Sequence, residues 1–117
     1  MSERRFASVQ RRVLEQYPYL STVKESMLVT DLKLPDCPIV YANDYFEKMT
    51  LYPKEYILGK NCRFLQGKYS NKDTVYQIRK AVDNGESLEV EILNYRKVCL
   101  KFEVKTMIFD SIIFYED

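Results

Sequence analysis

One cysteine lies in a short run of residues whose types suit ligand binding and thiol chemistry. Between Lys60 and Gly67 the chain carries one thiol, two amides and one cation, on Cys62, Asn61, Gln66 and Arg63. Glycine adopts backbone conformations that other residues avoid, so Gly59 and Gly67 can fix a turn on each side of a short helix. Residues four apart share a helix face, so we expect Cys62 and Gln66 to point into one pocket.

Taken alone, Cys62 is expected to be a small buried side chain, because free cysteine is among the most buried residue types. The complete run favours another interpretation. Residues 61–66 match at every position the flavin-binding signature of the LOV family, the blue-light-sensing branch of PAS domains. The chain resembles that family further at residues 29–31, 34–44, 55–59, 78–79 and 93–95, and the resemblance covers about residues 26–97.

The resemblance implies a blue-light sensory module that holds its flavin non-covalently and turns over no substrate. Cys62 would form a reversible bond to the C4a carbon of the photoexcited flavin, and signalling would follow by conformational change. The other implied flavin contacts are Thr30, Asn61, Arg63, Leu65, Gln66, Arg79, Ile92 and Asn94.

The chemical types of these residues fit the parts of a flavin mononucleotide. Arg63 and Arg79 match the family's phosphate-binding pair, because a guanidinium group makes charge-assisted, bidentate contacts with phosphate. Asn94 offers both a donor and an acceptor to the pyrimidine edge of the ring. LOV proteins that favour FAD commonly carry an insertion between the positions of Cys62 and Arg79. This chain has none, so FMN is expected rather than FAD.

The match deteriorates after Lys97. Val104 stands where the family carries a second pyrimidine-binding Asn, and Glu116 lies nearest the position of a Gln that contacts flavin N5 and O4. We therefore expect weak flavin binding. Two alternatives to a photoreceptor stay open, a light-silent PAS interaction domain with weak or no flavin binding, and a flavin redox enzyme.

Two hypotheses account for the atypical segment 98–117. It is either a divergent last pair of strands or the read-through of an unspliced intron, because Val98 and Cys99 can be encoded by GTATGT, a common intron start. The second hypothesis predicts that the chain lacks the family's last two strands. The apolar alternation at residues 102–108 favours the first, since it is typical of a strand.

The remaining chain must position these residues. Residues 2–16 are predicted to form a helix that Pro18 ends, with Phe6, Val9, Val13 and Tyr17 on one face. We divide the chain into a flanking helix, 1–22, and a PAS-like domain, 23–117. The helix either packs on its own domain or offers a surface to a second copy or an effector, as the face of the sheet also could.

Strands are predicted at residues 27–30, 38–42 and 87–97, followed by the atypical tail. Between them, helices are expected after Asn43 or Asp44, from Pro53, around Cys62, and from Asn71 or Asp73 to Gly85. Strands separated by a helical block indicate an α+β fold with an antiparallel sheet. The LOV resemblance adds that short helices cover one face of this sheet around a flavin cavity.

Composition excludes several classes of function. The 117 residues are 46% hydrophobic and 30% charged, as in a single globular domain. A net charge of +1 suggests no nucleic-acid partner, and three cysteines without any His exclude a Cys/His zinc site, so no metal is expected. The chain shows neither a membrane span nor a secretory signal. An intracellular setting, cytoplasmic or nuclear, is expected.

Overall fold

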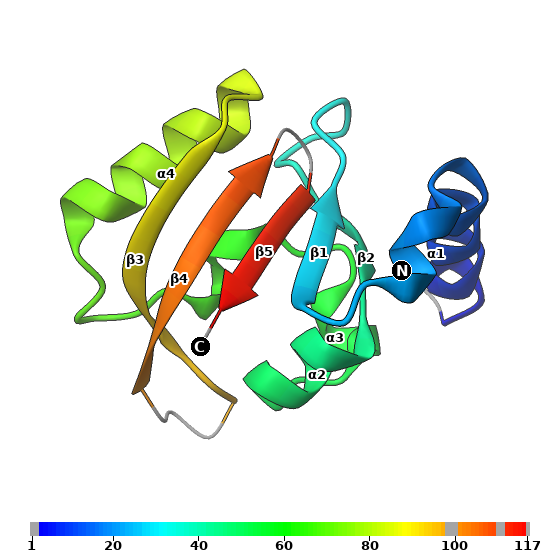
Figure 1. Cartoon of the computed structure of the whole chain (residues 1–117), viewed down its shortest axis with the longest axis horizontal. Coiled ribbons are helices and arrows are strands. Elements are labelled where there is room, and N and C mark those ends of the chain that lie inside the picture. Colours follow the sequence, from blue (N-terminus) through cyan, green and yellow to red (C-terminus); the bar gives the residue numbers. More distant parts are fainter. Residues whose placement is uncertain (1–2, 98–100, 110–111, 117) are drawn as a thin grey trace.

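Five strands form one antiparallel sheet in the computed structural model, which describes residues 3–97, 101–109 and 112–116. The strands are β1 (Ser26–Thr30), β2 (Ile39–Ala42), β3 (Leu88–Tyr95), β4 (Lys101–Phe109) and β5 (Ile112–Glu116). Their order across the sheet is β2-β1-β5-β4-β3, so the last strand lies in the middle (Figure 1). The predicted α+β fold with an antiparallel sheet is confirmed.

The helices between β2 and β3 begin and end at the residues that favour caps. They are α2 (Asp44–Thr50), α3 (Lys54–Ile57), the 3₁₀ helix η2 (Cys62–Leu65) and α4 (Lys72–Asn84). Of the alternatives left open, Asn43 caps α2 and Asn71 caps α4, because each side-chain oxygen accepts a backbone N–H of the first turn. Gly85, with φ 64°, ends α4 in the left-handed conformation that glycine favours.

The main hydrophobic core lies between these helices and the inner face of the sheet. It contains Leu28, Ile39, Phe46, Leu65, Ile78, Val82, Ile92, Val104, Ile108 and Ile113, all nearly inaccessible to solvent. On β4 the buried residues are Phe102, Val104, Thr106 and Ile108, so the alternation seen in the sequence does form a strand.

The described part of the atypical segment 98–117 forms two strands of the sheet, as the hypothesis of a divergent strand pair expects, and the read-through hypothesis stays a prediction about the gene. β4 pairs with β3 along its whole length, from Leu88 opposite Ile108 to Tyr95 opposite Lys101. β5 fills the place between β4 and β1. The sequence also allows a Ser2 cap on the first helix and a tight turn at Asp110 and Ser111, but both lie outside the described residues.

The N-terminal segment packs on the other side of the sheet. α1 (Glu3–Gln16) and the 3₁₀ helix η1 (Pro18–Thr22) follow one another, and α1 lies beside β2 at the end of the sheet away from β3 (Figure 1). A second apolar cluster joins them to the outer face, formed by Val13, Leu14, Tyr17, Leu20, Met27, Val29 and Tyr41.

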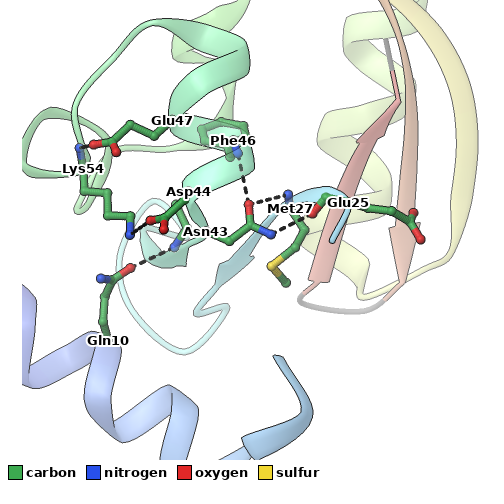
Figure 2. A network of polar contacts seen from close by, with 9 residues as sticks. Gln10, Glu25, Met27, Asn43, Asp44, Phe46, Glu47 and Lys54 are labelled. Carbon is green, nitrogen blue, oxygen red and sulfur yellow. Dashed lines mark hydrogen bonds and ion pairs between the residues drawn. The ribbon is translucent and has the colours of Figure 1, made fainter. Parts of the chain in front are cut away.

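Polar contacts fix the start of β1 and the end of β2 (Figure 2). The Asn43 oxygen accepts the backbone N–H groups of Met27 at 3.2 Å and Phe46 at 3.0 Å, while its amide donates to the Glu25 carbonyl at 2.7 Å. Gln10 of α1 accepts the Ala42 N–H at 3.0 Å. The N-terminal helix is thereby hydrogen-bonded to the strand that it flanks.

Candidate functional site

A cavity of about 590 Å³ lies among the loop after β1, the segment around η2 and one face of α4. Its lining residues fall within 32–37, 61–66 and 75–83. Pockets that bind small molecules and cofactors usually measure about 300–1,000 Å³. The cavity therefore has the size of a small-molecule site and is assembled from three segments far apart in sequence.

Five of the nine predicted site residues line this cavity, namely Asn61, Cys62, Arg63, Gln66 and Arg79. The other four are buried nearby. Leu65 and Ile92 belong to the main core, Thr30 ends β1 with 3% exposure, and Asn94 sits on β3, also with 3% exposure. The structure brings the first group together and leaves the second group in the surrounding core and sheet.

The segment around Cys62 is a single turn of 3₁₀ helix rather than the predicted α-helical face. Asn61 caps it by accepting the Arg63 N–H at 3.0 Å, and Gln66 follows it in an extended conformation. Cys62 and Gln66 reach the same cavity, although not through helical spacing of four residues. A 3₁₀ turn is common where a connection is this short.

The two bracketing glycines act for different reasons. Gly59 has φ 90°, which matches the expected need for an unusual backbone conformation. Gly67 is not in a positive-φ conformation, so the expected reason is wrong there. A Cβ at Gly67 would overlap the ring of Tyr95, so this glycine is required by close approach of β3.

The Cys62 thiol is buried and protonated. Its side chain is 7% exposed, and burial is the main cause that raises its pKa to about 12. At neutral pH the group is therefore a neutral thiol, which suits a reaction that begins only when a bound partner is activated.

An ion pair closes one side of the cavity. Arg63 donates from Nη1 to Asp36 Oδ1 at 2.8 Å and from Nη2 to Oδ2 at 2.6 Å. The Arg63 hydrogen bond is the main cause that lowers the pKa of Asp36, and Arg79 lowers it further through its charge. A phosphate that binds Arg63 would therefore compete with the Asp36 carboxylate for the same two guanidinium N–H groups.

Sequence reasoning missed Asp36 and Cys37, which also line the cavity. Both adopt left-handed backbone conformations, with φ 63° and 46°, which are uncommon for residues other than glycine. The clustered prolines and aspartates of residues 31–38 predicted a turn, but nothing in the sequence indicated that the turn faces the cavity.

The inner face of the sheet is largely apolar around the positions where the family resemblance fails. Val104, 1% exposed, lies opposite Ile92. On β5 Tyr115, 5% exposed, is buried together with Ile113, whereas Glu116 is exposed. Tyr115 was missed because only the residue nearest the family's Gln was considered, although period-two alternation with Ile113 places Tyr115 inside.

Two buried hydroxyls on this face, those of Thr106 and Ser26, lack a hydrogen-bond partner among the described residues. The hydroxyl of Thr106 is fully enclosed and makes no hydrogen bond to the described residues. Its residue pairs with Val90 on one side and Tyr115 on the other. An unsatisfied buried hydroxyl in a native core requires an explanation, and a ligand group is one.

Two other kinds of site are not found in the described residues. They contain no group of His, Cys, Asp and Glu side chains that could hold a metal ion. None of the described helices is long and apolar enough to cross a membrane.

Comparisons with known proteins identify the family to which the chain belongs. A family model described as a PAS domain matches residues 24–111. The chain is 42% identical over 92 residues to phototropin-1A of Oryza sativa subsp. japonica, which is 79% of this chain and 10% of that protein. It is 44% identical over 91 residues to a blue-light-activated histidine kinase of Rhizobium johnstonii, which is 78% of this chain and 26% of the kinase. The chain thus spans about a tenth of the phototropin and a quarter of the kinase.

Solved structures agree. The LOV domain of the Erythrobacter litoralis EL346 blue-light-activated histidine kinase superimposes with a TM-score of 0.76 at 30% identity, covering 81% of this chain and 96% of that one. The light-state aureochrome1 LOV domain gives 0.75 at 32% identity, covering 86% and 87%. The family match extends beyond Lys97 to residue 111, past the point where the sequence resemblance fails. The chain belongs to the PAS domain family, in its LOV branch.

Proposed function

We propose that this chain binds FMN non-covalently, senses blue light, and reports it through a reversible bond between Cys62 and the C4a carbon of the flavin. One observation carries the proposal. The single thiol of the family signature shares a cavity of about 590 Å³ with two amides, Asn61 and Gln66, and two guanidinium groups, Arg63 and Arg79. This set of donors and acceptors fits a ligand with a polar ring edge, a polyol and a phosphate.

The residues present fit the cofactor in chemical type. Arg63 and Arg79 are at the cavity and would hold the phosphate. Asn61 and Gln66 would serve the polyol and the ring edge. Asn94 and the unpartnered hydroxyl of Thr106 lie on the inner sheet face, where they would meet the other side of the ring.

Cys62 is the residue of the chain that would take part in the chemical reaction. When bound, the flavin absorbs blue light and supplies the electrophilic carbon. The buried Cys62 thiol provides the sulfur and releases its proton toward flavin N5, and the reverse transfer restores the dark state. Because burial holds the pKa near 12, the resting group is the thiol and an unexcited flavin leaves it unreacted.

The chain acts in this proposal as a sensor and turns over no substrate. A change in the cavity alters the packing of the sheet, and the balance between two packings carries the signal. α1 is bonded to β2 through Gln10 and packs on the outer face, so the flanking segment 1–22 is the proposed contact for a second copy or an effector. No nucleic-acid partner is proposed.

The test is a spectrum of the full chain loaded with FMN in the dark and then illuminated. We expect the blue absorption band of the flavin to bleach under blue light and to return in darkness. A protein that binds FMN but shows no reversible bleaching would contradict the photochemical proposal. FAD loaded in parallel is expected to bind less well, because no insertion between Cys62 and Arg79 makes room for the adenosine part.

A light-silent PAS interaction domain is the second candidate. The observation that favours it is the largely apolar inner face, where Val104 stands at the position of a family Asn and where the buried residue near the end of β5 is Tyr115 while Glu116 is exposed. Titration with FMN separates the two candidates. A photoreceptor binds it saturably, whereas an interaction domain whose cavity serves another purpose does not.

A further inference from the structure

Cys37 is a second buried thiol at the cavity, and the proposed photochemistry leaves it unused. It is 6% exposed and, like Cys62, both lines the cavity and belongs to the main hydrophobic core. Its neighbours Asp36 and Pro38 are part of the loop that joins β1 to β2.

Hydrogen bonds fix how this loop lies relative to η2. Ile39 N–H donates to the Lys60 carbonyl at 2.7 Å, and the Asn61 amide donates to the Asp36 carbonyl at 2.8 Å. The ion pair between Asp36 and Arg63 continues the same series. The two segments therefore run side by side in opposite directions.

The register of these contacts brings the two thiols together. Asp36, the residue before Cys37, bonds both Asn61 and Arg63, the residues on either side of Cys62. Cys37 and Cys62 line the same cavity, and the charge of Cys37 contributes to the raised pKa of Cys62, so the two thiols lie near one another. A disulfide requires Cα atoms about 4.4–6.8 Å apart, so closing it needs at most a local movement of the loop.

We propose that Cys37 and Cys62 are a redox pair that closes to an intramolecular disulfide and thereby removes the photoreactive thiol. The effect on light sensing rests on the function proposed above, whereas the disulfide itself does not. In this proposal Cys37 determines whether the Cys62 thiol is available. The oxidised chain keeps its cavity, but its Cys62 sulfur is bonded to Cys37 and cannot react with the flavin.

Hydrogen peroxide is the oxidant that the cavity can admit. Burial raises the pKa of both thiols, so the reaction runs slowly through the small thiolate fraction and becomes faster as the pH rises. The Cys37 thiol loses its proton and its sulfur attacks peroxide; the O–O bond breaks, a sulfenic acid forms, and the departing hydroxide takes up the proton to give water. The Cys62 sulfur then attacks the sulfenic sulfur, so the S–S bond forms and a second water leaves. In total two thiols and one peroxide give one disulfide and two waters. A dithiol reductant reverses the change.

The first part of the test uses the full chain without flavin and in the dark. Cys99→Ser removes the third cysteine, so that two thiols remain. The protein is reduced, freed of reductant and treated with peroxide. We expect both thiols to disappear together, the intact mass to fall by two hydrogen atoms, and a peptide linking residues 37 and 62 to appear after digestion. Dithiothreitol should restore both thiols.

Two variants on the Cys99→Ser background keep the result interpretable. Cys37→Ser and Cys62→Ser each retain one thiol and are expected to give no mass loss of two hydrogens. If the two-thiol protein keeps its thiols under peroxide while its urea-unfolded form loses them, the sulfurs do not meet and the proposal is wrong. Dimers linked through these cysteines in place of the intramolecular link would also overturn it.

The second part asks whether the disulfide silences the light response. In FMN-loaded protein, peroxide should abolish bleaching when Cys37 is present and leave it in Cys37→Ser. Equal loss in both would overturn the control role of Cys37. If the fully reduced protein never bleaches, the proposed photochemistry has failed, while the mass and thiol measurements still decide whether the redox pair exists.

Discussion

The cavity lining and the inner sheet face differ in how they meet a ligand. The lining mixes apolar side chains with polar and charged ones, namely two thiols, two amides, two arginines and the carboxylates of Asp36 and Asp83. The inner sheet face presents mostly apolar side chains, among them Ile92, Val104 and Ile113, with Ser26, Asn94 and Thr106 among the polar exceptions. The cavity lining carries the functional groups that the LOV resemblance implies. The inner sheet face lacks part of the implied set, because an apolar side chain, Val104, stands at the position of a family Asn.

This difference separates two requirements of a flavin photoreceptor. In the proposed function, the photoreactive thiol and the phosphate contacts would come from the lining, whereas the sheet would hold the edge of the flavin ring. A chain can keep the first without the second, and it then has the reactive group but a weaker hold on the chromophore. The predictions below test each side in turn.

The largest effect is expected from the lining. Cys62→Ala should retain bound FMN and lose reversible bleaching completely, because no other sulfur would carry the reaction. Absorption spectra before and after blue light measure it. Cys37→Ala is the matched control and, in reduced protein, should bleach as the unaltered chain does. Bleaching and recovery in Cys62→Ala would place the photochemistry elsewhere.

The second effect concerns the sheet. Val104→Asn returns an amide to a residue that is 1% exposed and opposite Ile92. A hydrogen bond from this amide to the flavin ring is worth about 0.5–1.5 kcal/mol, so FMN should bind roughly three- to tenfold more tightly. Fluorescence quenching titration measures the dissociation constant.

Val104→Ala controls for space alone. If Ala tightens FMN as much as Asn does, the gain comes from room in the core and not from a hydrogen bond. Without flavin, Val104→Asn should lower stability, since the amide is then buried without a partner. A tighter complex and a less stable free protein together would identify the sheet side as the weak half of the site.

Local signals in the sequence predicted the helices well. Asn43, Asn71 and Gly85 act at helix ends through bonds that span only a few residues, so their positions in sequence carry the information. The contiguous run 61–66 likewise forms one turn with most of its side chains at the cavity. Such features need no knowledge of distant residues.

The sequence did not predict which residues from distant segments come into contact. The fork of Arg63 on Asp36 joins residues 27 positions apart, and the need for Gly67 arises from a ring on β3. Tyr115 faces inward because β5 inserts between β1 and β4 in a particular register. A shift of one residue would turn Glu116 inward instead, and a sequence that diverges from its family does not show that register.

The third prediction concerns selectivity at the lining. Asp36→Asn should free the Arg63 fork for phosphate and remove a negative charge beside it. The pair is more than half exposed and therefore screened by solvent, so FMN should bind only a few-fold more tightly. Riboflavin, which lacks the phosphate, should show no gain. An equal gain for both flavins would mean that Asp36 acts by some route other than the arginine.

The smallest effect is expected from Thr106, the polar exception on β4. Its enclosed hydroxyl has no partner among the described residues, and Val has nearly the same shape. Thr106→Val should therefore stabilise the flavin-free protein by about 0.5–1 kcal/mol, because an unsatisfied buried group is removed while packing is kept. Urea unfolding measures the change.

Ser26→Ala is the matched control for Thr106→Val, since the Ser26 hydroxyl is the other enclosed and unpartnered side-chain atom of the described residues. Both changes should stabilise the free protein. Both residues pair with Tyr115 on the inner face, Ser26 from β1 and Thr106 from β4, so the comparison tests on which side of Tyr115 a bound ring is held. If the flavin ring uses the Thr106 hydroxyl, FMN affinity should fall in Thr106→Val alone. If the FMN affinity is unchanged in both variants, neither hydroxyl contacts the flavin, and Asn94 becomes the main candidate for a polar contact from the inner sheet face. The difference between the polar groups of the cavity lining and the largely apolar sheet face would then be larger. Destabilisation by Thr106→Val would show instead that the hydroxyl is already satisfied by a buried water in the free protein.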